Sequence, residues 1–84
     1  MSFSLLLERL RAELDRRTRG GEWTERGMAR RLGVSQPHIH NVIKGIRKLS
    51  PDMADHILHV LQIPMGALFR TEELEEMRRK RGRG

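Results

Sequence analysis

Basic side chains in the middle of the chain are the residues best suited to binding chemistry. Residues 23–50 hold six bases against one acid, Glu25, which gives this stretch a local net charge of +5. The whole chain of 84 residues carries a net charge of only +6, so nearly all of its excess positive charge lies here. A basic surface attracts phosphate groups by Coulomb force and releases their counterions. The charge pattern therefore favours a nucleic acid as the partner.

Two short helices separated by a tight turn are predicted within this basic stretch. Thr24 can cap a helix that runs to Leu32, and Gly33 suits the left-handed residue that commonly ends a helix. Ser35 can cap a second helix that ends at Gly45. Apolar residues recur in both at helical spacing and should face inward: Met28, Ala29, Leu32, Ile39, Val42 and Ile43. This is the pattern of a helix-turn-helix, which makes DNA the expected partner.

The outward face of the second helix carries the side chains best suited to reading bases. Once the apolar stripe is buried, the opposite face presents Gln36, Pro37, His40 and Asn41. Gln36 and Asn41 suit adenine, because an amide can accept from N6 and donate to N7. Pro37 offers only an apolar contact, for instance with a thymine methyl group. We expect these four residues to contact base edges, with ordinary solvated surface as the alternative for the two amides.

Residues around this face are expected to bind phosphates, which orients a protein on DNA without reading its sequence. Lys44 lies at the end of the second helix, and Arg47 and Lys48 lie in the basic loop after it. The residues expected to contact phosphates are lysines and arginines together with hydroxyl and imidazole donors: Thr24, Arg26, Arg30, Ser35, His38, Lys44, Arg47 and Lys48.

Three further segments are expected to position this motif. Apolar residues three and four apart predict an amphipathic helix over residues 3–17 with Phe3, Leu6, Leu7, Leu10 and Leu14 inward. Ser50-Pro51-Asp52 should begin a helix that runs to about residue 61 and buries Ala54, Ile57, Leu58 and Leu61. Residues 64–69 should form a short final turn over the core. No segment alternates with period two, so the predicted fold class is all-α.

The composition changes after Phe69, where a domain over residues 1–70 gives way to a charged extension over residues 71–84. Thr71 can cap a segment with acids first and bases last, an order that suits the helix dipole. Helical and irregular states of this segment both stay open, and residues 82–84 should fray. The apolar residues that a five-helix core needs least are Leu68, Phe69, Leu74 and Met77. We expect them to form a dimer contact.

The order of these residues resembles the lambda-repressor-like family, of the XRE or Cro and repressor type. The matching residues are Thr24-Glu25, Met28-Ala29, Leu32 to Pro37, Ile39, Gly45 and Leu61 to Pro64, and the similarity covers about residues 3–69. The resemblance implies a five-helix all-α domain whose second motif helix enters the major groove while the first lies across the backbone. It also implies two-fold dimers that bind half-sites about one helical turn apart.

Glu25 departs from the pattern of this family. The family usually carries glutamine at this position, which can hydrogen-bond a phosphate and brace the glutamine that begins the recognition helix. A phosphate would repel the carboxylate of Glu25. This residue could instead pair with a nearby arginine or accept from a cytosine amino group.

Other kinds of chemistry find little support in the sequence. The chain has no cysteine, and its four histidines do not repeat the spacing of a metal site. Ser35 and Ser50 are predicted helix caps, and no nucleophile, base and oxyanion donor assemble. We therefore expect no metal, no cofactor and no enzymatic activity. No stretch has the character of a signal peptide or a membrane span.

Together these features predict a cytoplasmic transcriptional regulator, a repressor that binds double-stranded DNA at a palindromic operator as a homodimer. Two alternatives are open. The chain could be an antitoxin whose C-terminal extension binds a protein partner, a toxin, while the domain autoregulates its operon. It could also be a nonspecific architectural nucleic-acid binder.

Overall fold

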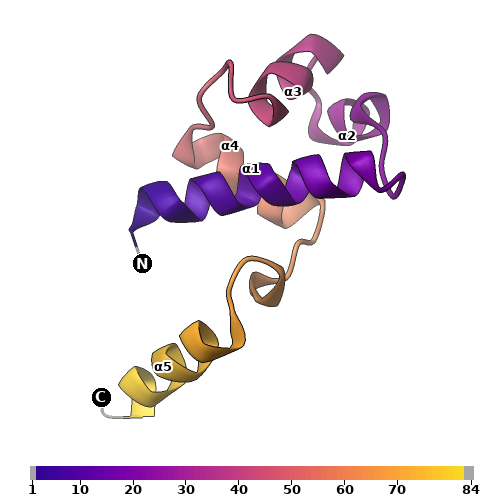
Figure 1. The fold of residues 1–84 in the computed structure, drawn as a ribbon. Helices are drawn as coiled ribbons and strands as arrows, with labels where there is room; N and C mark the ends of the chain where they lie inside the picture. The colour runs from indigo at the N-terminus through magenta and orange to yellow at the C-terminus, as the bar shows by residue number, and fades with distance from the viewer. Residues whose placement is uncertain (1, 83–84) are drawn as a thin grey trace.

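Short polar caps set the beginnings of the first four α-helices in the computed structural model, which describes residues 2–82. The hydroxyl groups of Ser2, Thr24, Ser35 and Ser50 each accept a backbone N–H three residues later, at 2.9 to 3.2 Å. The elements are α1 (Phe3–Arg19), α2 (Glu25–Leu32), α3 (Gln36–Ile43), α4 (Pro51–Val60), the 3-10 helix η1 (Met65–Ala67) and α5 (Thr71–Gly82) (Figure 1). The described residues contain no strand, so the all-α prediction is confirmed.

The ends of α2 and α4 use the same left-handed turn with different residues. Gly33 ends α2 with φ 74°, and the N–H of Val34 donates to the carbonyl of Ala29 at 3.0 Å. Gln62 follows α4 with φ 53°, and the N–H of Ile63 donates to the carbonyl of Leu58 at 3.2 Å. Glycine adopts this conformation without steric cost, whereas a residue with a side chain is strained there. The turn between α2 and α3 therefore forms as predicted.

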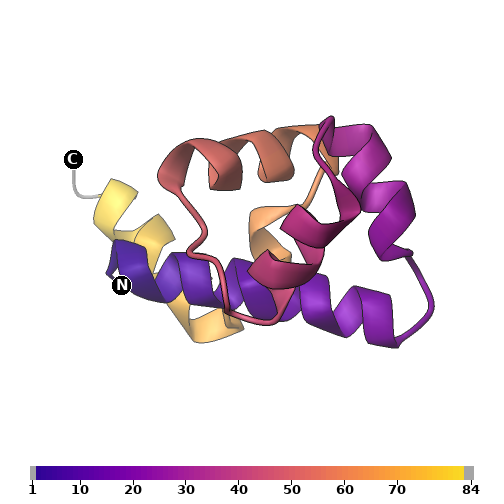
Figure 2. The same cartoon turned by 90° about the horizontal axis from the view of Figure 1, so that it is seen from above.

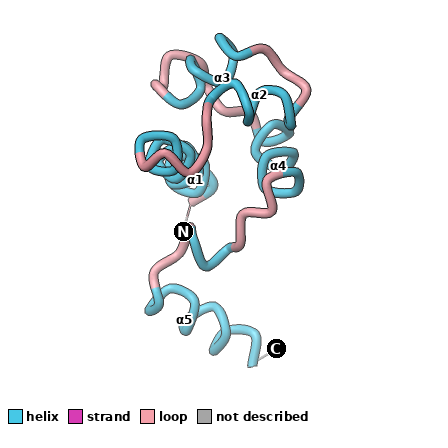
Figure 3. Tube along the Cα trace, turned by 90° about the vertical axis from the view of Figure 1, so that its right-hand side faces the viewer, coloured by secondary structure: helices cyan, strands magenta, loops and turns pink. Residues whose placement is uncertain are grey.

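The core is built from one apolar stripe on each of the first four helices. Its most deeply buried side chains are Leu10, Leu14, Ile39, Val42, Ile43 and Ile57, each less than 2% exposed. Figure 3 shows α2 and α3 on one side of α1 and α4, with α5 on the opposite side. Viewed from above, α1 runs along one edge of the domain and α4 along the other (Figure 2). The predicted inward residues of α2 and α3 are all buried.

Two apolar residues lie elsewhere than expected. Phe3 was assigned to the inward stripe of α1, but it is 50% exposed because it occupies the first position of the helix, beyond the core. Leu68 was assigned to a dimer surface, but it is 4% exposed and belongs to the core of the single chain. The chain after η1 therefore closes the core with Leu68, and this side chain is not free to contact a partner.

A buried carboxylate and two arginines stiffen the second half of α1. Glu13 is 8% exposed and accepts from Arg16 at 2.9 Å and from Arg17 at 2.7 Å. These hydrogen bonds, first that of Arg16, hold the pKa of Glu13 below its ordinary value against the opposing effect of burial. The guanidinium of Arg17 also lies 4.5 Å from the ring centre of Trp23. The loop that leads into α2 is thereby tied to α1.

The helix α5 leaves the domain and is fastened to it at its first turn. Thr71 is its first helical residue and not the cap, and the carboxylate of Glu73 accepts from the backbone N–H of Arg70 at 2.8 Å. Arg9 of α1 donates to the carboxylate of Glu73 and to the carbonyl of Leu68. The helix extends to Gly82, where fraying was expected. Residues 83 and 84, for which fraying was also expected, lie outside the described part of the chain.

Candidate nucleic-acid interface

The two helices of the motif are held by side chains from the flanking helices. Arg11 of α1 donates to the carbonyl of Ile43, in the last turn of α3, at 2.6 Å. His56 of α4 donates from Nε2 to the carbonyl of Leu32, at the end of α2, at 2.8 Å. Carbonyl groups at helix ends have no partner within the helix, so these contacts satisfy acceptors that would otherwise lack a partner. The end of α3 is therefore held by α1, and the end of α2 by α4.

The four expected base readers lie on the free face of α3. Gln36, Pro37 and His40 are exposed, and Asn41 is partly buried. The carbonyl of Asn41 accepts from the backbone N–H groups of Ile46 and Arg47, at 2.9 and 3.0 Å. These two bonds fold the basic loop back against the end of α3. The assignment of the four side chains to base contacts stays a prediction.

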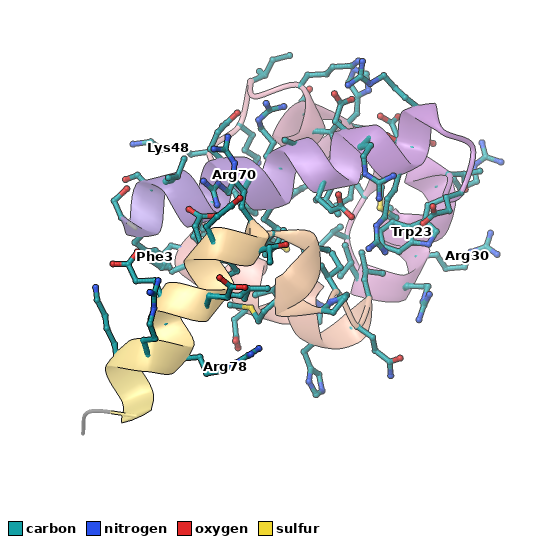
Figure 4. The ribbon with its side chains drawn as sticks, turned by 60° about the horizontal axis from the view of Figure 1, so that its bottom comes forward. Phe3, Trp23, Arg30, Lys48, Arg70 and Arg78 are labelled. Carbon is teal, nitrogen blue, oxygen red and sulfur yellow. The ribbon has the colours of Figure 1, made fainter. Side chains whose placement is uncertain are left out.

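The residues expected to contact phosphates are of two kinds: exposed lysines and arginines, and residues that also stabilise the fold. Exposed side chains include Arg26, Arg30, Lys44, Arg47 and Lys48. Figure 4 shows Arg30 pointing away from the helices. Thr24 and Ser35 already accept the N–H bonds of their helix caps, which leaves each hydroxyl hydrogen free to donate to a phosphate. His38 is partly buried in the first turn of α3.

Ion pairing separates the basic motif from the rest of the domain. Each of the five arginines of α1 forms an ion pair with a carboxylate: Arg9, Arg11, Arg16, Arg17 and Arg19. Within residues 2–82 none of the six lysine and arginine residues of the motif forms an ion pair with a carboxylate. The charge of α1 is therefore neutralised locally, whereas that of the motif is available to an external anion.

The one acid of the motif contacts the recognition helix. Glu25 begins α2, and its two carboxylate oxygens lie 3.2 and 3.1 Å from Nδ1 of His40. The expected pairing of Glu25 with an arginine is wrong, because His40 on the facing helix is closer. The resemblance carried a partial signal for this contact, because it implies that the residue at position 25 braces the recognition helix.

Among the described residues no three histidine, aspartate or glutamate side chains are grouped so that they could hold a metal ion. No helix within residues 2–82 is long and apolar enough to span a membrane.

Comparison with known families agrees with this geometry. Residues 16–68 match the profile of a helix-turn-helix family. The match runs from the last turn of α1 to the end of the core and includes every expected contact residue for DNA, but it excludes α5. Comparisons with curated proteins and with solved structures found no match.

Proposed function

The chain belongs to the helix-turn-helix family of DNA-binding domains of the XRE or Cro and lambda-repressor type, and from this premise we propose that it is a sequence-specific transcriptional regulator. We infer that it acts as a repressor and binds a palindromic operator as a homodimer. The observation that carries the proposal is a set of six basic residues on α2, at the end of α3 and in the loop after it, none of which has an ion-pair partner within residues 2–82. Basic side chains of this kind supply the part of the DNA affinity that does not depend on the base sequence.

In the proposed complex, α3 enters the major groove and α2 lies across the backbone. Gln36 and Asn41 contact adenine, and Pro37 and His40 complete the base-reading face. Arg26 and Arg30 on α2, together with Lys44, Arg47 and Lys48, neutralise phosphates on either side of the groove. The hydroxyls of the caps, Thr24 and Ser35, and the side chain of His38 complete the phosphate contacts.

The homodimer is proposed to form through the apolar side chains beyond the core. Phe69 and Leu74 are partly buried, and Met77 is 42% exposed on α5. Because α5 lies on the opposite side of the domain from α2 and α3, a contact there leaves the DNA-binding face uncovered. Leu68 is left out of this contact because it is buried in the core.

Selection of bound sites from random DNA duplexes tests the proposal most directly. A two-fold dimer should enrich an inverted repeat with half-sites about one helical turn, ~34 Å, apart. Enrichment of a single half-site would support sequence reading but not the dimer. Binding without any enriched sequence would refute the regulator proposal and favour an architectural DNA-binding protein.

A second function is favoured by the free surface of α5. This helix extends away from the domain (Figure 1). It exposes Met77 between an acidic first half and a basic second half. In an antitoxin, such a helix would bind a toxin while the domain represses its own operon. The two functions differ in what α5 contributes to operator binding, which a deletion of this helix measures.

A further inference from the structure

The contact between Glu25 and His40 joins the two helices of the motif on their exposed side. His40 stands on the free face of α3, one helical turn after Gln36 and one before Lys44. Its Nδ1 is 3.1 and 3.2 Å from the two oxygens of Glu25. The side chain of His40 is 46% exposed and that of Glu25 is 25% exposed. The pair therefore lies at the surface that the proposed function assigns to DNA.

The carboxylate decides which nitrogen of His40 carries the proton. An ionised carboxylate can only accept hydrogen bonds, so the nitrogen that faces it must donate. In the neutral ring this places the hydrogen on Nδ1 and leaves a lone pair on Nε2. No protein atom within residues 2–82 hydrogen-bonds to Nε2. The free nitrogen of a neutral His40 is thus an acceptor, and it becomes a donor only when the ring is protonated.

We propose that Glu25 is a positioning residue that makes His40 a hydrogen-bond acceptor and thereby selects bases with an exocyclic amino group. In the major groove those groups are N4 of cytosine and N6 of adenine. Guanine presents acceptors at N7 and O6, and thymine presents an acceptor at O4, so neither can donate to Nε2. The inference rests on the proposed function, because it requires α3 to lie in the major groove.

Other charges around the ring do not compete with Glu25. The other charged or titratable groups of α1, α2 and α3 include Asp15, Arg19, Arg26 and His38, and Lys44 directly follows α3. Asp15 and Arg19 line a shallow hollow together with Glu25 and Lys44, but they pair with each other at 3.0 Å. None of the five hydrogen-bonds to the ring of His40 in the described part of the chain. The tautomer therefore depends on Glu25.

The tautomer can be measured without DNA from the ¹⁵N chemical shifts of the imidazole ring. At pH 8, His40 of the free protein should show a protonated Nδ1 and an unprotonated Nε2. In Glu25→Gln the side-chain amide can donate as well as accept, so the other tautomer should appear. Asp55→Asn, on the exposed surface of α4, removes the same charge and should leave His40 unchanged. A wild-type ring protonated mainly on Nε2 would overturn the proposal, whatever its DNA binding.

The base preference can be measured by selection of bound sites from random DNA duplexes. At pH 8 the wild type should favour cytosine or adenine at one base pair per half-site by about fivefold, the factor expected of one hydrogen bond. Glu25→Gln should lose this preference.

Two outcomes separate this proposal from the proposed function. Identical base preferences in the wild type and Glu25→Gln would refute the selecting role of Glu25 while leaving sequence-specific binding intact. Absence of any selected sequence would refute the proposed function and with it the base contact. The tautomer measurement would still decide whether Glu25 sets the tautomer of His40, because it does not involve DNA.

Discussion

Lys48 gives the simplest test of the phosphate contacts, because it is exposed, follows the recognition helix and has no ion-pair partner within residues 2–82. Lys48→Ala should weaken binding to all DNA sequences alike. It should also flatten the slope of log affinity against log salt by about 0.9, the value for one neutralised phosphate. Lys80→Ala is the matched control, since Lys80 lies on α5 and pairs with Glu76 at 3.8 Å. A changed base preference in Lys48→Ala would contradict the phosphate assignment.

Gln36 tests base reading. Its side chain is exposed at the first position of α3, where it has no part in the helix cap. Gln36→Ala should cost about 1 to 3 kcal/mol on the preferred site and much less on random DNA, because only a base contact is lost. Titration of both DNAs measures the difference, with circular dichroism as the check on folding. Equal losses on the two DNAs would remove Gln36 from the reading face.

Individual residues also mark where sequence-based prediction succeeds and where it fails. The exposure of Gln36, Pro37 and His40 could be predicted, because burial of the apolar stripe of α3 leaves one face free. The contact of Glu25 with His40 could not, since it joins residues 15 positions apart and depends on how closely two helices cross. The burial of Leu68 depends in the same way on the path of the chain after α4.

Among the elements, the helices were the most predictable feature, because their ends are determined locally. A serine or threonine cap begins each of the first four α-helices, and Gly33 ends α2 as expected. The beginning of α5 was misplaced by one residue, because Arg70 contributes a backbone N–H to Glu73 where a side-chain cap at Thr71 was expected. A glutamate that accepts from the backbone N–H three residues earlier has a weaker sequence signal than a hydroxyl cap.

The turn after α4 offers a stabilising substitution. Gln62 holds a positive φ of 53°, a conformation that costs a residue with a side chain roughly 1 to 2 kcal/mol. Gln62→Gly should remove the strain and, after the larger entropy loss of glycine, stabilise the domain by about 0.5 to 1 kcal/mol. Thermal unfolding should shift upward by a few degrees. Gln62→Ala is the control and should give no comparable gain; an equal gain would show that the glutamine side chain itself is unfavourable.

The attachment of α5 should depend on acid pH. The hydrogen bond from Arg9, followed by that from the backbone of Arg70, lowers the pKa of Glu73 from 4.5 to about 2. A carboxyl with a lowered pKa in the folded state contributes its stabilisation above pH 4.5 and loses it as the pH falls toward 2. NMR shifts of the Glu73 carboxyl and of α5 amides should follow this range. A midpoint near 4.5 would show that neither hydrogen bond persists in solution. Arg9→Ala should raise the midpoint, because only the hydrogen bond from the backbone of Arg70 remains.

At the scale of the whole molecule, the position of α5 opposite the motif predicts the effect of removing it. Deletion of residues 71–84 should leave the core folded, because Leu68 remains, but shift the protein toward monomer. Operator affinity should fall by more than charge explains, since the deleted segment carries five bases and four acids. Sedimentation and operator titration measure both effects. An unchanged dimer with unchanged affinity would contradict the dimer contact and leave α5 to a protein partner, as in an antitoxin.

The anchoring of the motif has a consequence for how the protein could change its target over evolution. Arg11 and His56 hold α3 and α2 through the backbone carbonyls of Ile43 and Leu32, which are present whatever side chains those positions carry. Residues on the exposed face of α3 can therefore be replaced while the backbone contacts that position the helix are retained. Glu25 and His40 are the exception, because each is the other's partner. New operators should be reachable by single substitutions elsewhere on this face, but by coordinated substitutions at these two positions.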